Sequence, residues 1–252
     1  MKQLLMSAVL IFGLAINTVA QEITLFGASD LRYALDEVKA LFLESHPNDR
    51  LNMIYGSSGK GMHQIENGAP YDIYFSANMD FVQKLYEQGD IITQPKLYAI
   101  GRVVIWSKSK EFEAEKGFEN LTQAWVKKIA IANPLHAPYG EKAKQALESM
   151  KLYDSVQSQL VLGENISQTV GFIASETADI GIVALSMVLV PAIAEAEQSS
   201  YYLIDAALHE PLRQGYGLTK YSQRSALAQE FYDFMQTPEA QEIMKKHGFE
   251  RP

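Results

Sequence analysis

The chain alternates short apolar runs of strand character with stretches of helical periodicity. Strand-like runs cover residues 22–27, 51–55 and 73–76, and helix-like patterns cover 29–42 and 60–67 between them. Such alternation predicts a sheet of parallel strands covered by helices, because each helix carries the chain back to the start of the next strand.

The same pattern continues through the middle of the chain and ends in two helices. The first of these carries Ala226, Phe231 and Phe234 on one face, and the second is capped by Thr237 and Pro238. No Pro/Gly-rich linker interrupts the pattern, so a domain boundary would run through extended segments. The length suits one large or two small α/β domains. Further candidates are strands at 103–106, 129–132, 160–162 and 180–183, and helices at 141–150 and 167–175.

The first twenty residues resemble a secretory signal peptide. Lys2 gives a positive start, residues 4–16 are apolar, and Thr18 to Ala20 offers small residues for cleavage before Gln21. The alternative, a membrane anchor, would need about 20 apolar residues. The chain contains 0 cysteines although it is expected to be exported, which fits a bacterial periplasmic protein that folds without disulfides.

The formal net charge of −8 limits the classes of partner that this chain is suited to bind. An acidic chain is poorly suited to bind nucleic acid or an anionic membrane surface. The overall charge also does not attract an anion, so an anion site would have to use local dipoles.

Two serine-bearing turns are the most specific functional signal. Gly27-Ala28-Ser29 and Gly56-Ser57-Ser58-Gly59 each follow a strand-like run and open a helix-like run. Backbone N–H groups at a helix start lack partners and lie at the positive end of the helix dipole. Two such ends facing one space would bind a small oxyanion. Read alone, the same serines are ordinary caps or turn residues.

Signals for catalysis are weak. The spacing at 56–61 does not match a nucleotide-binding phosphate loop, and no metalloprotease or nucleophile-elbow motif occurs in the sequence. The histidines are scattered. His136 lies in a loop at 133–140 that could approach a ligand, but no carboxylate or cysteine partner is evident for it. We therefore expect a receptor, with no catalytic residues and no cofactor.

Several motifs, in order along the chain, resemble the periplasmic molybdate-binding proteins of ABC importers. The most specific is Gln-Ile-x-x-Gly-Ala-Pro-x-Asp at 64–72, which follows similar stretches at 26–31 and 55–59. Matching segments continue at 163–166 and 181–183, and the resemblance covers nearly all of the mature chain.

The resemblance implies a type II periplasmic binding protein with two α/β domains. Each domain would hold a mixed sheet flanked by helices, with the ligand in the cleft between them. The first domain would comprise residues 21–103 and 212–252, and the second 104–211. The implied cargo is molybdate, and with it tungstate, delivered by a monomer to a membrane permease. Molybdenum would enter only as the oxyanion, with no direct protein–metal ligand.

The resemblance also implies the binding residues. Hydroxyl ligands fall on Ser29 and Ser58, and backbone N–H ligands fall on Ala28 or its neighbour, Tyr139 and Ile166. Many relatives carry a tyrosine after the strand at 181–183, where this chain has Ala184. We expect the Tyr139 hydroxyl to replace it, the alternative being that Tyr139 only packs over the cleft.

Two other functions stay open. The first is binding of another tetrahedral anion, such as sulfate or chromate, which the changes at Ala184 and Tyr139 could permit. The second is an enzyme on the same fold, for example a deaminase- or transferase-like protein, for which His136 is the candidate catalytic group.

Overall fold

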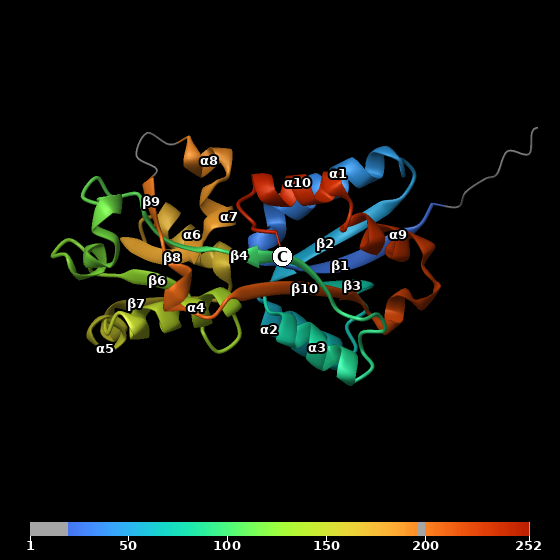
Figure 1. The fold of residues 1–252 in the computed structure, drawn as a ribbon, viewed down its shortest axis with the longest axis horizontal. Coiled ribbons are helices and arrows are strands. Elements are labelled where there is room, and N and C mark those ends of the chain that lie inside the picture. Colours follow the sequence, from blue (N-terminus) through green and yellow to red (C-terminus); the bar gives the residue numbers. More distant parts are fainter. Residues whose placement is uncertain (1–19, 196–199, 252) are drawn as a thin grey trace, which may run out of the picture.

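The computed structural model describes residues 20–195 and 200–251, which form two α/β lobes placed end to end (Figure 1). The predicted signal peptide falls almost wholly on residues outside this part of the chain and stays a prediction. No helix in the part described is long and apolar enough to cross a membrane.

The first lobe is built on a five-stranded mixed sheet with the order β2-β1-β3-β10-β4. β1 pairs in parallel with β2 and β3, whereas β10 runs antiparallel to both β3 and β4. The strands are β1 (Glu22–Ala28), β2 (Arg50–Gly56), β3 (Ile73–Ser76), β4 (Lys96–Gly101) and β10 (Leu212–Leu218).

The second lobe repeats this plan with the order β7-β6-β8-β5-β9. β6 is parallel to β7 and β8, and β5 is antiparallel to β8. The strands are β5 (Val103–Ser107), β6 (Ile129–Ala132), β7 (Leu160–Gly163), β8 (Ile180–Ala184) and β9 (Ser200–Leu203). Mixed sheets in two lobes confirm the predicted fold class. The parallel pairing expected from the alternation holds for β1 with β2 and β3 and for β6 with β7 and β8, whereas β4, β5, β9 and β10 form antiparallel pairs that the alternation did not reveal.

Helices cover both faces of each sheet. In the first lobe they are α1 (Arg32–Glu44), α2 (Ser58–Glu66), α3 (Met79–Glu87), α9 (Ala226–Phe234) and α10 (Pro238–Lys246). In the second lobe they are α4 (Pro138–Ser149), α5 (Tyr153–Val156), α6 (Ile166–Ala174), α7 (Leu185–Val188) and α8 (Pro191–Ala194). Short 3-10 helices are η1 (Ser29–Leu31), η2 (Ala114–Thr122), η3 (Gln157–Gln159), η4 (Ala206–Leu208) and η5 (Lys220–Arg224).

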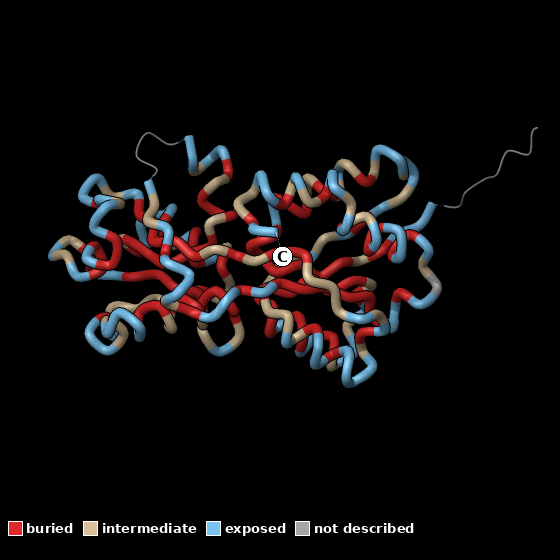
Figure 2. Tube along the Cα trace, viewed as in Figure 1, coloured by how far each residue is buried: buried red, intermediate tan, exposed pale blue. Residues whose placement is uncertain are grey.

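The buried core follows from these layers (Figure 2). In the first lobe, one face of the sheet packs against α1, α9 and α10, and the other packs against α2 and α3. In α1 the buried side chains Ala34, Leu35, Val38 and Phe42 recur at the helical spacing expected from the sequence. The apolar core of the second lobe extends across to Ala28 and Ala77 of the first, so the two lobes touch.

The chain crosses between the lobes twice. It leaves the first sheet at the end of β4 and enters the second at the start of β5, with Arg102 alone between them. It returns through residues 204–211 into β10, which lies in the middle of the first sheet. The first crossing is thus a single residue, and the second contains the 3-10 helix η4 (Ala206–Leu208).

Candidate functional site

A small cavity lies between the lobes, at the point where four helices begin. The parallel strands β1, β2, β6 and β7 all end toward it, and the helices η1, α2, α4 and α6 start there. Ligands of open α/β sheets bind at this edge, beyond the carboxyl ends of the strands. The cavity lining comprises Ala28, Ser29, Asp30, Gly56, Ser57, Ser58, Ala77, Ala137, Pro138, Tyr139 and Ile166.

The structure thus brings together all five residues expected from the sequence. Ala28, Ser29 and Ser58 line the cavity from the first lobe, and Tyr139 and Ile166 line it from the second. The cavity measures about 10 Å³, close to the space of one water-sized sphere. A cavity this small favours a compact ligand over an extended one.

Ser58 is held so that its hydroxyl faces the cavity as a donor. Its Oγ accepts the backbone N–H of Ala77 at 2.9 Å, and its own carbonyl accepts the Tyr74 hydroxyl at 2.6 Å. Because the oxygen already accepts a hydrogen bond, its proton is free for an acceptor in the cavity. Ser58 is also the first residue of α2, where backbone N–H groups lack intrahelical acceptors.

Ser29 opens η1 on the same side of the cavity and is only 3% exposed. Its backbone carbonyl accepts the Ser167 hydroxyl of the second lobe at 3.2 Å. The next carbonyl, of Asp30, accepts the Ser186 hydroxyl at 2.9 Å. These bonds tie the turn at Ser29 to the second lobe across the cleft.

Tyr139 and Ile166 supply helix starts from the second lobe. Pro138 is the first residue of α4 and has no N–H, so Tyr139 carries the first N–H of that helix. Ile166 is the first residue of α6, and the Asn165 side chain caps that helix by accepting the N–H of Gln168 at 3.0 Å. The N–H of Ile166 is therefore left for another acceptor.

The Tyr139 hydroxyl has protein partners in this structure. It accepts Nε2 of Gln214 at 3.0 Å, and Asp30, which accepts the same Nε2, is close enough for the hydroxyl to lower the pKa of its carboxyl. Ala184, where the resemblance leads us to expect a tyrosine, ends β8 fully buried and is not among the residues that line the cavity. That the Tyr139 hydroxyl binds an anion stays a prediction, and Asp30 is the competing acceptor for its proton.

Direct contacts between the lobes hold the cleft closed around this space. The N–H of Gly59 donates to the His136 carbonyl at 2.9 Å, and Ser57 Oγ lies 3.0 Å from His136 Nδ1. Lys60 forms an ion pair with Glu164 at the rim. His136, the one candidate for a catalytic group, is thus bonded to a serine hydroxyl and to a backbone amide.

Comparison with known proteins agrees with this geometry. The model of the bacterial extracellular solute-binding protein family matches residues 23–250. The chain belongs to that family. Its members are binding proteins found outside the cytoplasm, not enzymes.

Individual members of the family are similar over nearly the whole chain. The molybdate-binding protein ModA of Rhodobacter capsulatus is 32% identical, covering 95% of this chain and 92% of that protein. ModA of Azotobacter vinelandii is 29% identical, covering 94% and 92%. The solved structure of the periplasmic molybdate-binding protein of A. vinelandii has a TM-score of 0.84 at 31% identity, covering 91% and 99%.

In this solute-binding protein the cavity holds one acidic residue that the sequence analysis did not single out. Asp30 lines the cavity and is 2% exposed. Burial raises the pKa of its carboxyl from 3.8 to about 6, although hydrogen bonds from Gln214 and Tyr139 oppose the rise. An acidic residue in the first turn of a helix normally reads as a solvated, dipole-stabilising side chain, so only its tertiary surroundings reveal it.

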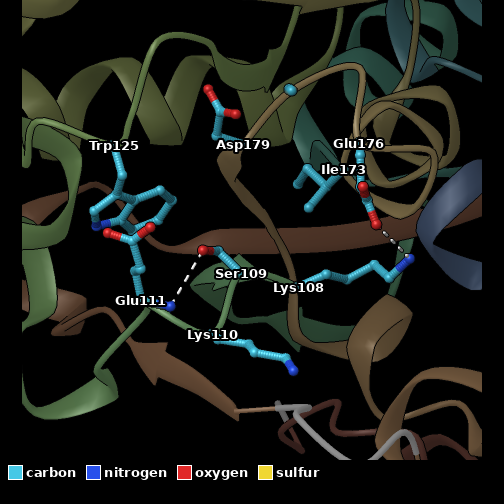
Figure 3. A pocket seen from close by; sticks show the side chains of 9 residues that line it. Lys108, Ser109, Lys110, Glu111, Trp125, Ile173, Glu176 and Asp179 are labelled. Carbon is cyan, nitrogen blue, oxygen red and sulfur yellow. Dashed lines mark hydrogen bonds and ion pairs between the residues drawn. The ribbon is translucent and has the colours of Figure 1, made fainter.

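A larger hollow of about 540 Å³ lies on the second lobe, away from the cleft (Figure 3). Two of its charged side chains, Lys108 and Asp179, are already paired. Lys108 donates to the Ala174 carbonyl at 2.9 Å and pairs with Glu176, and Asp179 accepts two backbone N–H groups. No group of three or more metal-ligating side chains occurs among residues 20–195 and 200–251. The inter-lobe cavity is therefore the better candidate site.

Proposed function

We propose that this protein captures molybdate in the inter-lobe cavity and delivers it to an ABC permease in the membrane. The observation that carries the proposal is the convergence of four helix starts on a cavity of about 10 Å³ that no Lys or Arg side chain lines. Relatives named as molybdate-binding proteins, matched over almost the whole chain, support the choice of anion.

The donor set suits an oxyanion without protons. Molybdate is fully deprotonated at neutral pH, so each of its oxygens accepts hydrogen bonds. We assign the hydroxyls of Ser29 and Ser58 and the backbone N–H groups at Ala28 or its neighbour, Tyr139 and Ile166 as its ligands. Bonds to charged acceptors contribute about 1.5–3 kcal/mol each, so a few such donors suffice for tight binding.

The same donor set disfavours hydrogen phosphate. That ion carries a proton that needs an acceptor, and an unpaired buried donor costs about 1–3 kcal/mol. The one acid that lines the cavity, Asp30, has its Oδ2 bonded to Nε2 of Gln214 at 2.9 Å, and the other assigned groups are all donors. A pocket of donors also satisfies every oxygen of sulfate, so sulfate must be rejected by its size. Tungstate is nearly the same size as molybdate and should bind too.

The remaining parts of the proposal concern the whole chain. We assign residues 21–103 with 212–252 to one domain and 104–211 to the other, closing on the anion about the crossings at Arg102 and 204–211. We also propose that residues 1–20 direct export, that the protein acts in the periplasm, and that it acts as a monomer.

A thermal-shift screen tests the choice of anion. A ligand that binds only the folded state stabilises it by about 4 kcal/mol at a thousand times its Kd. Molybdate and tungstate should each raise Tm clearly, and sulfate and phosphate at equal concentration should not. Ser29→Ala should reduce the molybdate shift, and Ser175→Ala, an exposed serine of the second lobe, should leave it unchanged. A larger shift with sulfate than with molybdate would reject the assignment.

A further inference from the structure

Asp30 is out of place in a site for a doubly charged anion. Of the described residues that line the cavity it is the one acid, and none of the others is Lys, Arg or His. No ion pair involving Asp30 occurs in the part of the chain that the structure describes. An anion entering this cavity therefore meets a buried carboxylate with no cation to offset it.

Neutral donors fix the carboxylate in place. The Tyr98 hydroxyl donates to Oε1 of Gln214 at 2.6 Å, which orients the amide so that its Nε2 faces Asp30 Oδ2 at 2.9 Å. The same Nε2 lies 3.0 Å from the Tyr139 hydroxyl, which is close enough to Asp30 to lower the pKa of its carboxyl. The Asp30 side chain is thus bonded to Gln214 of β10, beside the Tyr139 hydroxyl of the second lobe.

The groups around Asp30 do not supply a charge either. From β4 and α4 it faces the hydroxyls of Tyr98 and Tyr139, whose pKa values burial raises well above 10, so both are neutral. From α6 and α7, the hydroxyls of Ser167 and Ser186 donate to the backbone carbonyls of Ser29 and Asp30, and both hydroxyls are uncharged. His136 and the Lys60–Glu164 pair lie at the rim, against the start of α2.

We propose that Asp30 takes up one proton from solvent when the cleft closes on a divalent oxyanion. The proton bonds to a carboxylate oxygen, and no other covalent bond changes. A dianion then adds one net negative charge to the closed cavity instead of two. This inference rests on the proposed function, because it needs an oxyanion in the cavity. Burial already holds the pKa of Asp30 near 6 without the anion, and a neighbouring dianion raises it further.

Calorimetric titration with molybdate tests this directly. At pH 7.5, in buffers of different ionisation enthalpy, the wild type should take up close to one proton per anion bound. Its affinity should fall by up to about tenfold per pH unit between pH 7 and 9, as linkage requires for one proton gained. Molybdate itself does not titrate in this range, so the change reports the protein.

Two variants locate the proton. Asp30→Asn keeps the shape and the acceptor oxygen, and its binding should take up no proton and be independent of pH. Asp72→Asn is the matched control, because Asp72 is a half-buried carboxyl of the same lobe whose pKa burial also raises, and whose Oδ2 accepts the N–H of Thr24 instead of lining the cavity. This control should behave as the wild type does.

The outcomes separate this inference from the proposed function. Molybdate binding by the wild type without proton uptake would overturn the role of Asp30 and leave the receptor function intact. Uptake that persists in Asp30→Asn would also overturn it and would move the proton to another group, such as His136. If no oxyanion binds at all, the proposed function fails and this inference fails with it. If Asp30→Asn binds too weakly to measure, the buffer series on His136→Asn takes its place: uptake that persists there excludes His136, and uptake that disappears overturns the role of Asp30.

Discussion

Ser58 Oγ accepts the backbone N–H of Ala77 at 2.9 Å, and this bond fixes the direction in which the serine donates. Ser58→Ala should weaken molybdate binding by roughly ten- to a hundredfold, because it removes one donor to a charged acceptor. It should also lower the free energy of unfolding by about 1–3 kcal/mol, since the buried N–H of Ala77 loses its partner. Titration calorimetry and urea unfolding measure the two effects. An unchanged affinity would reduce Ser58 to a structural residue.

The Lys60–Glu164 pair spans the cleft with both side chains about half exposed, so its effect should be small. Glu164→Gln should weaken molybdate binding by no more than about fivefold, because exposed pairs contribute up to about 1 kcal/mol. The loss should shrink in high salt. Glu148→Gln, which breaks the Lys144–Glu148 pair within the second lobe, is the control. A loss above tenfold that salt does not reduce would mean that Glu164 acts on the anion site itself.

Tyr139→Phe deletes one oxygen and keeps the ring in place. If the hydroxyl donates directly to the anion, its loss should weaken binding by roughly tenfold in the wild type. A double-mutant cycle with Asp30→Asn separates the two uses of the proton. If the hydroxyl acts only through Asp30, whose pKa it lowers, its loss should ease protonation of Asp30 and leave wild-type binding undiminished. An equal loss in both backgrounds would show that the hydroxyl contacts the anion directly, as the sequence comparison predicts.

Asp30 should also make stability depend on pH. Its pKa is about 6 in the fold and 3.8 in the unfolded chain, so the folded state binds more protons between these values. Stability should therefore fall as pH rises from 4 to 6, by a total of about 3 kcal/mol for a shift of roughly two units, and stay low above pH 6. Asp30→Asn should flatten this slope in urea unfolding at pH 5 and pH 8. If the free energy of unfolding of Asp30→Asn kept the full wild-type dependence on pH, the prediction would be wrong.

The sequence predicted the parts of the fold that depend on local pattern. The strands β3 and β6 and the helices α2 and α6 fall within a few residues of their expected bounds, because each has an apolar run or a helical stripe of its own. β10 was missed. Its glycines Gly215 and Gly217 lie against Met79 and Ile91. These neighbours can come close because glycine has no side chain, and a hydrophobic pattern does not reveal such positions.

The candidate site was predicted in part, for a similar reason. Serines at the ends of apolar strands indicate helix starts, and the motif resemblance pointed to Tyr139 and Ile166. How a side chain is used was beyond such patterns. Nothing near Tyr139 in the sequence suggests that Gln214, far along the chain, donates a hydrogen bond to its hydroxyl. Nor does it suggest that the hydroxyl lies close enough to Asp30 to lower the pKa of that carboxyl.

The sequence alone therefore determined which helices begin beside the cleft, because caps, turns and strand ends are local features governed by backbone hydrogen bonding. The tertiary structure decided what those helix starts enclose. It brought the turn at Ser29 against Ser167 and Ser186, and it placed Asp30 between β10 and α4, where water cannot reach it. Burial and neighbouring charge set the protonation of a carboxyl, and both depend on residues distant in sequence that only the folded chain brings together.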